Sequence, residues 1–295
     1  MGKSSRDHGD IAWAAAFNAP AVFFLAAFIL VPVAGTVVTG FFRDITFLPV
    51  KFIGLENLVR VSGGREFGQS AAFTLSFAAV TVPLELFTGL MLALLLDRKF
   101  PGRDLVRAAV LIPWAIPSAV SARVWELIYN YSYGLANTLL AWSGLSSSPV
   151  NWLGTGAGAF WAIVIADVWK TAPFTAIIFL AGLQALPQDI YLQARVDRAG
   201  VFKRFFLITL PLIKPVFIVA LLFRTIDCLR IFDLVYVLTH GGPGGTTDAV
   251  SLYAYKNFLG GDFGFGSAVS VILFAISLAL AAVYLKAGKF GEGIK

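Results

Sequence analysis

The sequence has little charge, a single cysteine and two histidines. Only 14% of its 295 residues are Asp, Glu, Lys or Arg, whereas a soluble domain carries about 25%. The charged surface that a water-soluble fold needs is therefore missing. Cys228 has no partner, which excludes an intrachain disulfide scaffold. His8 and His240 are too few and too far apart for a metal cluster, so we expect no metal site.

The sequence instead contains long hydrophobic segments. Hydrophobic residues make up 58% of the chain and the mean hydropathy is +0.80. A bilayer core needs about 20 helical residues to cross it, and only helices or closed barrels satisfy their backbone there. The pattern predicts an all-α, multi-pass membrane protein, a single domain over residues 1–295. Its six predicted transmembrane helices are 19–40, 71–96, 108–128, 159–183, 215–238 and 263–285.

Lys and Arg are distributed unevenly between the two sides of these helices. Fourteen of the 23 lie in the chain ends and the loops on one side, five lie on the opposite side and four lie inside predicted helices. Because cytoplasmic loops are enriched in Lys and Arg, both termini are predicted to be cytoplasmic. The net charge of +6 is then a topology signal, and we expect no nucleic-acid partner.

Charged residues inside the predicted helices are candidates for function, because they are costly in a membrane. Most are spaced at i, i+3, where opposite charges can meet on a helix surface. Such groups either pair to lock helix packing or line a solute path. Nine residues of the fifth predicted helix turn by about 180°, so its four charges are not expected to face one cavity together. The groups are Arg123 and Glu126, Asp167 and Lys170, and Arg224, Asp227, Arg230 and Asp233.

Glu85 is the only charge in the second predicted helix. A carboxylate at that depth must find a cation on another helix or be protonated. Pairing is favoured, because four intramembrane cations are available. The alternative is a proton- or sodium-coupled secondary carrier that uses Glu85 and the charges of the fifth helix.

No phosphate-binding P-loop occurs in the chain, since Gly2-Lys3-Ser4 has no glycine-rich loop before it. Cys228 has no neighbours that indicate a nucleophile, and the carboxylates do not pair in a loop. We therefore expect no catalytic residues, no ATPase site and no cofactor bound by this chain.

The loop at 184–214 is the longest connection on the predicted cytoplasmic side. Residues 189–199 have helix-forming content between Pro187 and Gly200, and phenylalanines follow at 202, 205 and 206. This pattern predicts a short helix beneath the membrane with an apolar anchor. A projecting element of this kind is suited to contact a partner protein.

At this loop the chain resembles the permease subunits of binding-protein-dependent ABC importers. Their signature is E-A-A, three residues, G, nine residues, then I-x-L-P. The spacing is intact here, but Leu and Gln replace the first two residues and Arg replaces the Gly. The matching positions are Leu192, Gln193, Ala194, Arg198, Ile208, Leu210 and Pro211.

Four further segments are similar to the carbohydrate permeases of this family, the type paired with maltose, trehalose and glycerol-phosphate systems. They extend the resemblance over nearly the whole chain. They are F-I-G-L-E-N at 52–57, L-I-P-W-A-I-P at 111–117, A-G-L-Q-A-L-P at 181–187 and F-D-L-V-Y-V-L-T-H-G-G-P at 232–243.

The resemblance implies a heteromeric importer in a prokaryotic cytoplasmic (inner) membrane. Its other parts would be a second, similar permease, two cytoplasmic ATPase subunits that bind ATP and Mg, and an extracytoplasmic sugar-binding protein. The short helix in the loop would insert into a cleft of the ATPase, and the three departures from the signature alter that contact. The coupling residues are then Leu192, Gln193, Ala194, Asp197, Arg198, Ala199 and Gly200.

By analogy with maltose permeases, the sugar would pass near the bilayer midplane between the two permeases. Trp114, Trp125 and Trp169 could stack on a sugar ring or simply pack. The expected contacts from the fifth and sixth helices are Asp227, Arg230, Ile231, Asp233, Ser267 and Ser270.

Overall fold

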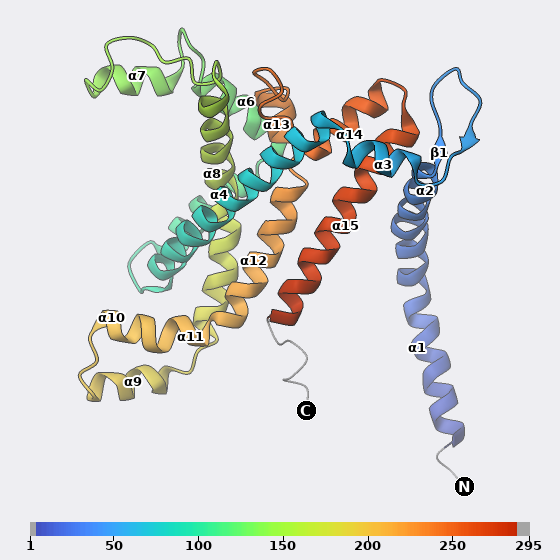
Figure 1. Ribbon diagram of the computed structural model, residues 1–295. Coiled ribbons are helices and arrows are strands. Elements are labelled where there is room, and N and C mark those ends of the chain that lie inside the picture. Colours follow the sequence, from blue (N-terminus) through green and yellow to red (C-terminus); the bar gives the residue numbers. More distant parts are fainter. Residues whose placement is uncertain (1–3, 288–295) are drawn as a thin grey trace. The chain divides into compact units, whose positions relative to one another are not determined.

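The computed structural model describes residues 4–287, which are almost entirely helical (Figure 1). The chain forms two compact units, Met1–Gly63 with Ala254–Ile272 and Gly64–Tyr253 with Leu273–Lys295. The all-α fold class is confirmed. The two chain ends, predicted to be cytoplasmic, lie outside the described residues.

The first unit begins with a long apolar helical segment and a small hairpin. Residues 13–40 are long and apolar enough to cross a membrane, in agreement with the first predicted helix. The elements are α1 (Ser4–Leu25), η1 (Ala26–Leu30), α2 (Val31–Gly40), β1 (Phe42–Arg43), β2 (Lys51–Phe52) and α3 (Glu56–Ser62). The strands are antiparallel, with Phe42 opposite Phe52.

Polar contacts connect the parts of this unit. The Asn57 side-chain amide donates to the carbonyls of Gly40, at 3.1 Å, and Phe42, at 2.8 Å. The Gly40 carbonyl is one that α2 leaves free at its end and the Phe42 carbonyl belongs to β1, so the amide joins the end of the helix to the hairpin. Arg60 forms an ion pair with Asp262 at 3.6 Å and lies 4.6 Å from the ring centre of Phe265.

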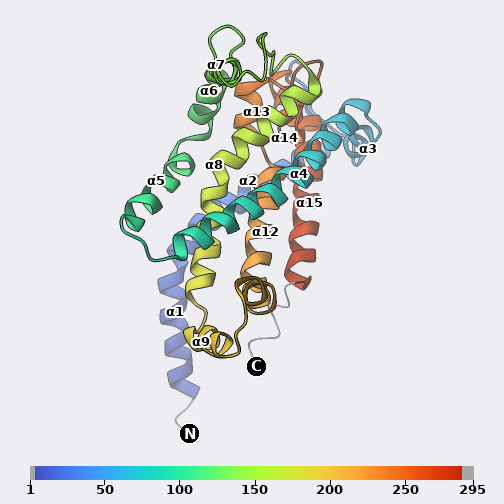
Figure 2. The ribbon, with the colours of Figure 1, turned by 90° about the vertical axis from the view of Figure 1, so that its left-hand side faces the viewer.

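The second unit is built around the packed pair α4 and α8, with α12 against both (Figures 1 and 2). Its helices are α4 (Arg65–Asp97), α5 (Arg103–Ala115), α6 (Ser118–Ile128), α7 (Leu135–Trp142), α8 (Gly156–Gln184), α9 (Gln188–Val196), α10 (Val201–Arg204), η2 (Phe205–Thr209), α11 (Leu210–Leu212), α12 (Lys214–Leu229) and α13 (Asp233–Leu238). Helices α14 (Val250–Leu259) and α15 (Phe263–Ala287) each contribute to both units.

Small residues allow α4, α8 and α12 to approach closely. A Cβ added at Gly89 of α4 would lie 2.7 Å from the Thr175 Cβ of α8, and one at Gly182 of α8 would lie 2.8 Å from Val216 of α12. In a membrane, where apolar burial does not drive helix association, such close packing supplies much of the attraction.

Four described helices are individually long and apolar enough to span a membrane, and the number rises to six if two bent pairs each count as one span. The span predicted at 108–128 corresponds to one of these bent pairs, because α5 and α6 meet at 93°. Pro117 lacks the N–H that would continue the helix through this point.

The bounds of the span predicted at 215–238 are wrong. Helix α12 ends at Leu229 and α13 begins at Asp233. The bent pair that can form the fifth span instead joins 201–212 to 214–229 at 66°. At the interruption, the carbonyl of Ile231 accepts a hydrogen bond from the Ser251 hydroxyl, so a side chain replaces a helical donor.

Candidate functional site

Glu85 and Arg224 form a buried ion pair between α4 and α12. Glu85 is fully buried and Arg224 is 4% exposed. Arg224 Nε lies 2.6 Å from Glu85 Oε2 and Arg224 Nη2 lies 2.8 Å from Oε1, so both carboxylate oxygens are bound. This two-pronged geometry is the strongest arrangement for an arginine and a carboxylate. The expectation that Glu85 pairs with a cation on another helix is confirmed.

The same guanidinium also contacts two aspartates. Its Nη2 lies 3.4 Å from Asp167 Oδ2 of α8, and its Nη1 lies 3.1 Å from Asp227 Oδ2 on its own helix. The other oxygen of Asp227 accepts from Arg230 Nη2 at 2.8 Å. Asp227 therefore connects the buried Arg224 to Arg230, whose side chain is 72% exposed.

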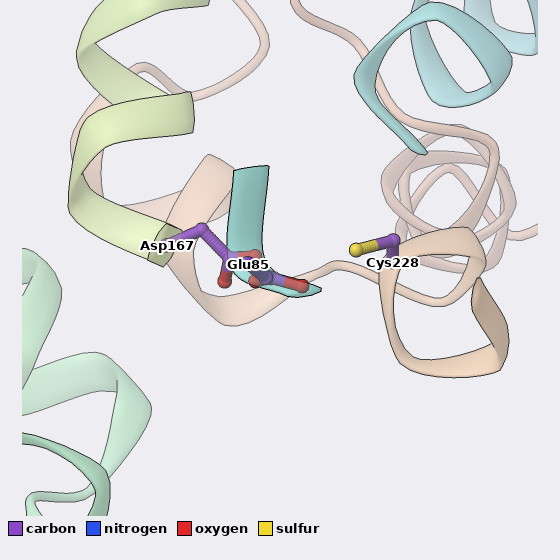
Figure 3. A group of neighbouring side chains, drawn as sticks. All are labelled: Glu85, Asp167 and Cys228. Atoms are coloured by element: carbon purple, nitrogen blue, oxygen red, sulfur yellow. The ribbon is translucent and has the colours of Figure 1, made fainter. Parts of the chain in front are cut away.

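Figure 3 shows the Glu85 and Asp167 side chains close together and the Cys228 sulfur pointing toward them. One potential ligand atom from each of the three lies within 4.8 Å of the others, a spacing that a metal ion could use. The Arg224 guanidinium contacts all three, with its Nη2 3.7 Å from the Cys228 sulfur. The Arg224 guanidinium thus supplies the positive charge that a metal ion would otherwise bring to these three groups.

Lys170 does not form an ion pair with Asp167, so of the two alternatives left open by their spacing the locking pair is not observed. Its ammonium donates to the carbonyl oxygens of Ile116 and Trp114, the latter at 3.5 Å. Both carbonyls belong to the break between α5 and α6, where no helical N–H reaches them. A cation is also favoured at the C-terminal end of a helix. By contrast, the expected pair of Arg123 and Glu126 is formed at 2.6 Å on the exposed surface of α6.

A cavity of about 550 Å³ opens beside this network in the second unit. Its lining combines the broken ends of α5 and α12 with polar residues of α8 and α13. The lining residues are Trp114, Ala115, Ile116, Pro117, Ser118, Asp167, Lys170, Thr171, Arg224, Asp227, Cys228, Arg230, Ile231, Phe232, Asp233 and Leu234.

All four charges of the fifth predicted helix line this cavity, so the expectation that they could not face it together is wrong. A regular helix would have rotated Asp233 away from Arg224. The interruption at 230–232 resets that rotation and returns Asp233 to the same side.

Four of the six residues expected to contact substrate therefore lie together, namely Asp227, Arg230, Ile231 and Asp233. Ser267 and Ser270 belong to the first unit and are not among the described residues that line this cavity. Ser267 is buried, and the Ser270 hydroxyl donates to the Gly266 carbonyl at 3.0 Å.

The tryptophans divide in the same way. Trp114 lines the cavity and stacks on Phe174 with ring centres 5.4 Å apart. Trp125 and Trp169 lie edge to face at 5.6 Å and do not line it. The sequence offered no means to separate these roles, and it carried no signal for Ser251 as the side chain that satisfies the break.

The loop at 184–214 contains the expected short helix, α9, which extends beyond the end of α8 (Figure 1). Tyr191 on this helix hydrogen-bonds to Thr209 at 3.0 Å, which ties α9 to the segment that leads into α12. Leu192 and Gln193 are exposed and Ala194 is buried, so one face of α9 is free and the opposite face packs.

Helix α9 ends in a turn at Arg198, the position at which the signature has glycine. Arg198 has φ of +53°, which is left-handed backbone. The N–H of Ala199 donates to the carbonyl of Ala194 at 2.9 Å and that of Arg198 donates to Arg195 at 3.0 Å. This is the Schellman arrangement that ends helices, in which the left-handed position is usually glycine. The helix-ending turn therefore forms although Arg198 occupies the position of the glycine. Asp197 precedes this position and Gly200 lies two residues after it.

A helical chain with membrane-spanning helices, a charged cavity and this loop is typical of a transport subunit, and sequence comparison gives the family. Residues 85–287 match the model of the binding-protein-dependent transport system inner membrane component. The chain belongs to this family.

Curated relatives cover nearly the full length. The trehalose/maltose transport system permease protein MalF of Thermococcus litoralis is 54% identical over 92% of each chain. The sulfoquinovosyl glycerol transport system permease protein SmoG of Agrobacterium fabrum is 41% identical over 95% of this chain and 91% of its own. Among solved structures, a chain of a bacterial alginate ABC transporter in complex with its periplasmic protein has the same fold, with a TM-score of 0.83 at 21% identity and 96% coverage of both chains.

Proposed function

We propose that this chain is one of two permease subunits of an ATP-driven carbohydrate importer in a prokaryotic cytoplasmic membrane. Family membership supports the importer class. The names of the relatives support the solute class, because those for trehalose, maltose and sulfoquinovosyl glycerol are all for sugars or sugar derivatives.

The observation that carries the proposal is the cavity beside the Glu85–Arg224 pair. Its volume falls in the range of about 300–1,000 Å³ found for small-molecule sites. Carboxylates accept and guanidinium groups donate hydrogen bonds, and sugar hydroxyls can do both. The exposed ring of Trp114 adds an apolar surface of the kind on which a sugar ring can stack.

The charges of the cavity favour a neutral sugar. Three acidic residues, Asp167, Asp227 and Asp233, and three basic residues, Lys170, Arg224 and Arg230, line it. The lining charges are equal in number, and Glu85 behind the lining already pairs with Arg224, so the cavity offers many charged hydrogen-bonding groups without an excess of positive charge to hold an anion. A neutral polyol matches this arrangement better than a charged one.

ATP hydrolysis by the partner subunits would be coupled to transport through α9. In this proposal α9 docks on one of two ATPase subunits that bind ATP and Mg, a second permease completes the pathway, and an extracytoplasmic protein delivers the sugar. Leu192 and Val196 are 55% and 82% exposed and lie four residues apart on one side of α9. This apolar pair, with Gln193 and the turn from Asp197 to Gly200, supplies the docking surface.

Asp233→Asn in the complete importer tests the cavity. Among the described residues Asp233 makes no ion pair, so its neutralisation leaves the Glu85–Arg224 network intact. Uptake of labelled trehalose or maltose into proteoliposomes should fall about tenfold or more, because a hydrogen bond to a charged group contributes about 1.5–3 kcal/mol.

Asp104→Asn is the matched control, since that side chain is 86% exposed on α5 and does not line the cavity. It should transport like the unaltered protein. Equal uptake by Asp233→Asn and Asp104→Asn, with both sugars transported, would show that the solute does not use this cavity.

A further inference from the structure

A second cavity, of about 480 Å³, lies at the end of the second unit that carries the 184–214 loop. It is bounded by the C-terminal end of α4, the end of α8, α9 and the segment α10–η2. Its lining is mostly apolar, with two arginines. The lining residues are Met91, Leu94, Asp97, Arg98, Leu183, Tyr191, Val201, Phe202, Arg204, Phe205, Phe206 and Thr209.

The two arginines lack anionic partners among the described residues. Within residues 4–287, neither Arg98 nor Arg204 forms an ion pair, and Asp97 in the same lining pairs with neither. The Arg204 Nε is buried and has no acceptor in the part of the chain that the structure describes. A buried donor without an acceptor costs about 1–3 kcal/mol, more when it is charged. An anionic group in this cavity would supply the missing acceptor.

The rest of the lining fits a hydrocarbon chain. Leu183 is buried at the end of α8, while Phe202 and Phe206 are 81% and 58% exposed. Exposed phenylalanines beside basic residues are typical of helices that lie at the boundary between lipid headgroups and acyl chains. The cavity lies where α4 and α8 end, on the side that the Lys and Arg distribution marks as cytoplasmic, and anionic lipids are concentrated in that leaflet.

We propose that this cavity binds an anionic phospholipid of the cytoplasmic leaflet. The phosphate lies between Arg98 and Arg204, and an acyl chain lies along the phenylalanines of α10–η2. The Tyr191–Thr209 hydrogen bond is part of the same lining, so the lipid braces α9 against the end of the membrane domain. A soluble phosphate would satisfy the arginines but would leave the apolar half of the cavity unfilled.

Lipid retention by the intact importer tests the proposal. The complex is exchanged into nanodiscs that contain phosphatidylcholine and phosphatidylglycerol, extracted into detergent, and analysed by native mass spectrometry for bound lipid. The unaltered protein should retain phosphatidylglycerol in preference to phosphatidylcholine. Arg98→Gln and Arg204→Gln should each reduce that preference about fivefold, because one basic residue near anionic lipid contributes about 1 kcal/mol.

Three comparisons make the result specific. Lys203→Gln removes an equal charge one residue away but does not line the cavity, so it should keep the preference. Arg204→Lys keeps the charge and should retain most of the preference for phosphatidylglycerol. This variant separates loss of lipid binding from loss of folding. Inorganic phosphate should fail to displace the lipid. Equal retention of both lipids by the unaltered protein, an equal loss in Lys203→Gln, or displacement by phosphate would each overturn the proposal.

Discussion

Glu85 shows how a single side chain can determine the packing of three helices. Its carboxylate is bound through both oxygens by Arg224 of α12, and the Thr171 hydroxyl of α8 donates to it as well. Burying two charges is expensive, so the pair is not by itself a large source of stability. Removing one partner is different, because the other is left buried and only partly compensated.

Glu85→Leu should therefore destabilise the protein by about 3–5 kcal/mol. The expected readout is a lower thermal unfolding midpoint of the purified importer, followed by tryptophan fluorescence. Glu126→Leu breaks the exposed pair with Arg123 and should cost less than about 1 kcal/mol. If both variants unfold at the same temperature, the buried pair does not hold the helices together. The triple variant Glu85→Leu/Asp167→Asn/Arg224→Met should recover much of the loss, because it also removes the buried carboxylate that pairs with Arg224, while Asp227 keeps Arg230.

For Arg198 we predict a change of the opposite sign, because its replacement by glycine should stabilise the structure. An L-residue in left-handed backbone costs about 1–2 kcal/mol relative to glycine. Arg198→Gly should therefore stabilise the end of α9 and slow amide hydrogen exchange in residues 188–196 about fivefold. Arg195→Gly, inside the helix, should speed that exchange, because glycine weakens a helix interior by about 1 kcal/mol. Faster exchange in Arg198→Gly would contradict the assignment of this turn.

At the scale of elements, the contact between α4 and α8 depends on Gly89. Gly89→Ala places a methyl group 2.7 Å from the Thr175 Cβ and 3.1 Å from the backbone nitrogen of Ala176, so α8 must move. We expect a loss of about 1–3 kcal/mol. Gly68→Ala adds the same atom to the same helix in open space and should be neutral or slightly stabilising. Thermal unfolding of the two variants side by side measures the difference, and equal midpoints would rule out a tight contact at Gly89.

Spacing along the sequence predicts ion pairs within regular helices and does not predict contacts at helix breaks. The spacing i, i+3 correctly predicted the contacts of Arg123 with Glu126 and of Arg224 with Asp227, because both lie on regular helix. For Lys170 the same spacing left two alternatives open and could not decide between them, because the carbonyls that Lys170 binds are freed only by the break at Pro117.

The cavity illustrates the same limit. The residue types that line it were predicted, but their convergence depends on the interruption at 230–232, which nothing in the local pattern marks. Likewise, the sequence indicated that Glu85 needs a cation without identifying which of four. That choice depends on how α4 and α12 each pack against α8, which contacts such as Gly89 with Thr175 and Gly182 with Val216 fix.

At the scale of the whole molecule, the proposed coupling through α9 has its own test. Leu192→Asp/Val196→Asp places two charges on the exposed apolar side of the helix. ATPase subunits should no longer co-purify with the complex, while the second permease still does. Gln188→Asp, also exposed but in the first turn of α9, should keep the ATPase. Retention of the ATPase by the double variant would place the docking surface elsewhere.

The energy source is the most direct test of the function proposed for this chain. The complete importer, and separately this chain with its second permease alone, are reconstituted in proteoliposomes with the extracytoplasmic binding protein on the outside. Uptake of labelled trehalose or maltose is then measured with ATP inside the vesicles or with an imposed proton or sodium gradient. We predict accumulation only with ATP and only when the ATPase subunits are present. Uptake by the permeases alone, driven by an ion gradient, would instead establish a secondary carrier and make the Glu85–Arg224–Asp167 network the place to look for ion coupling.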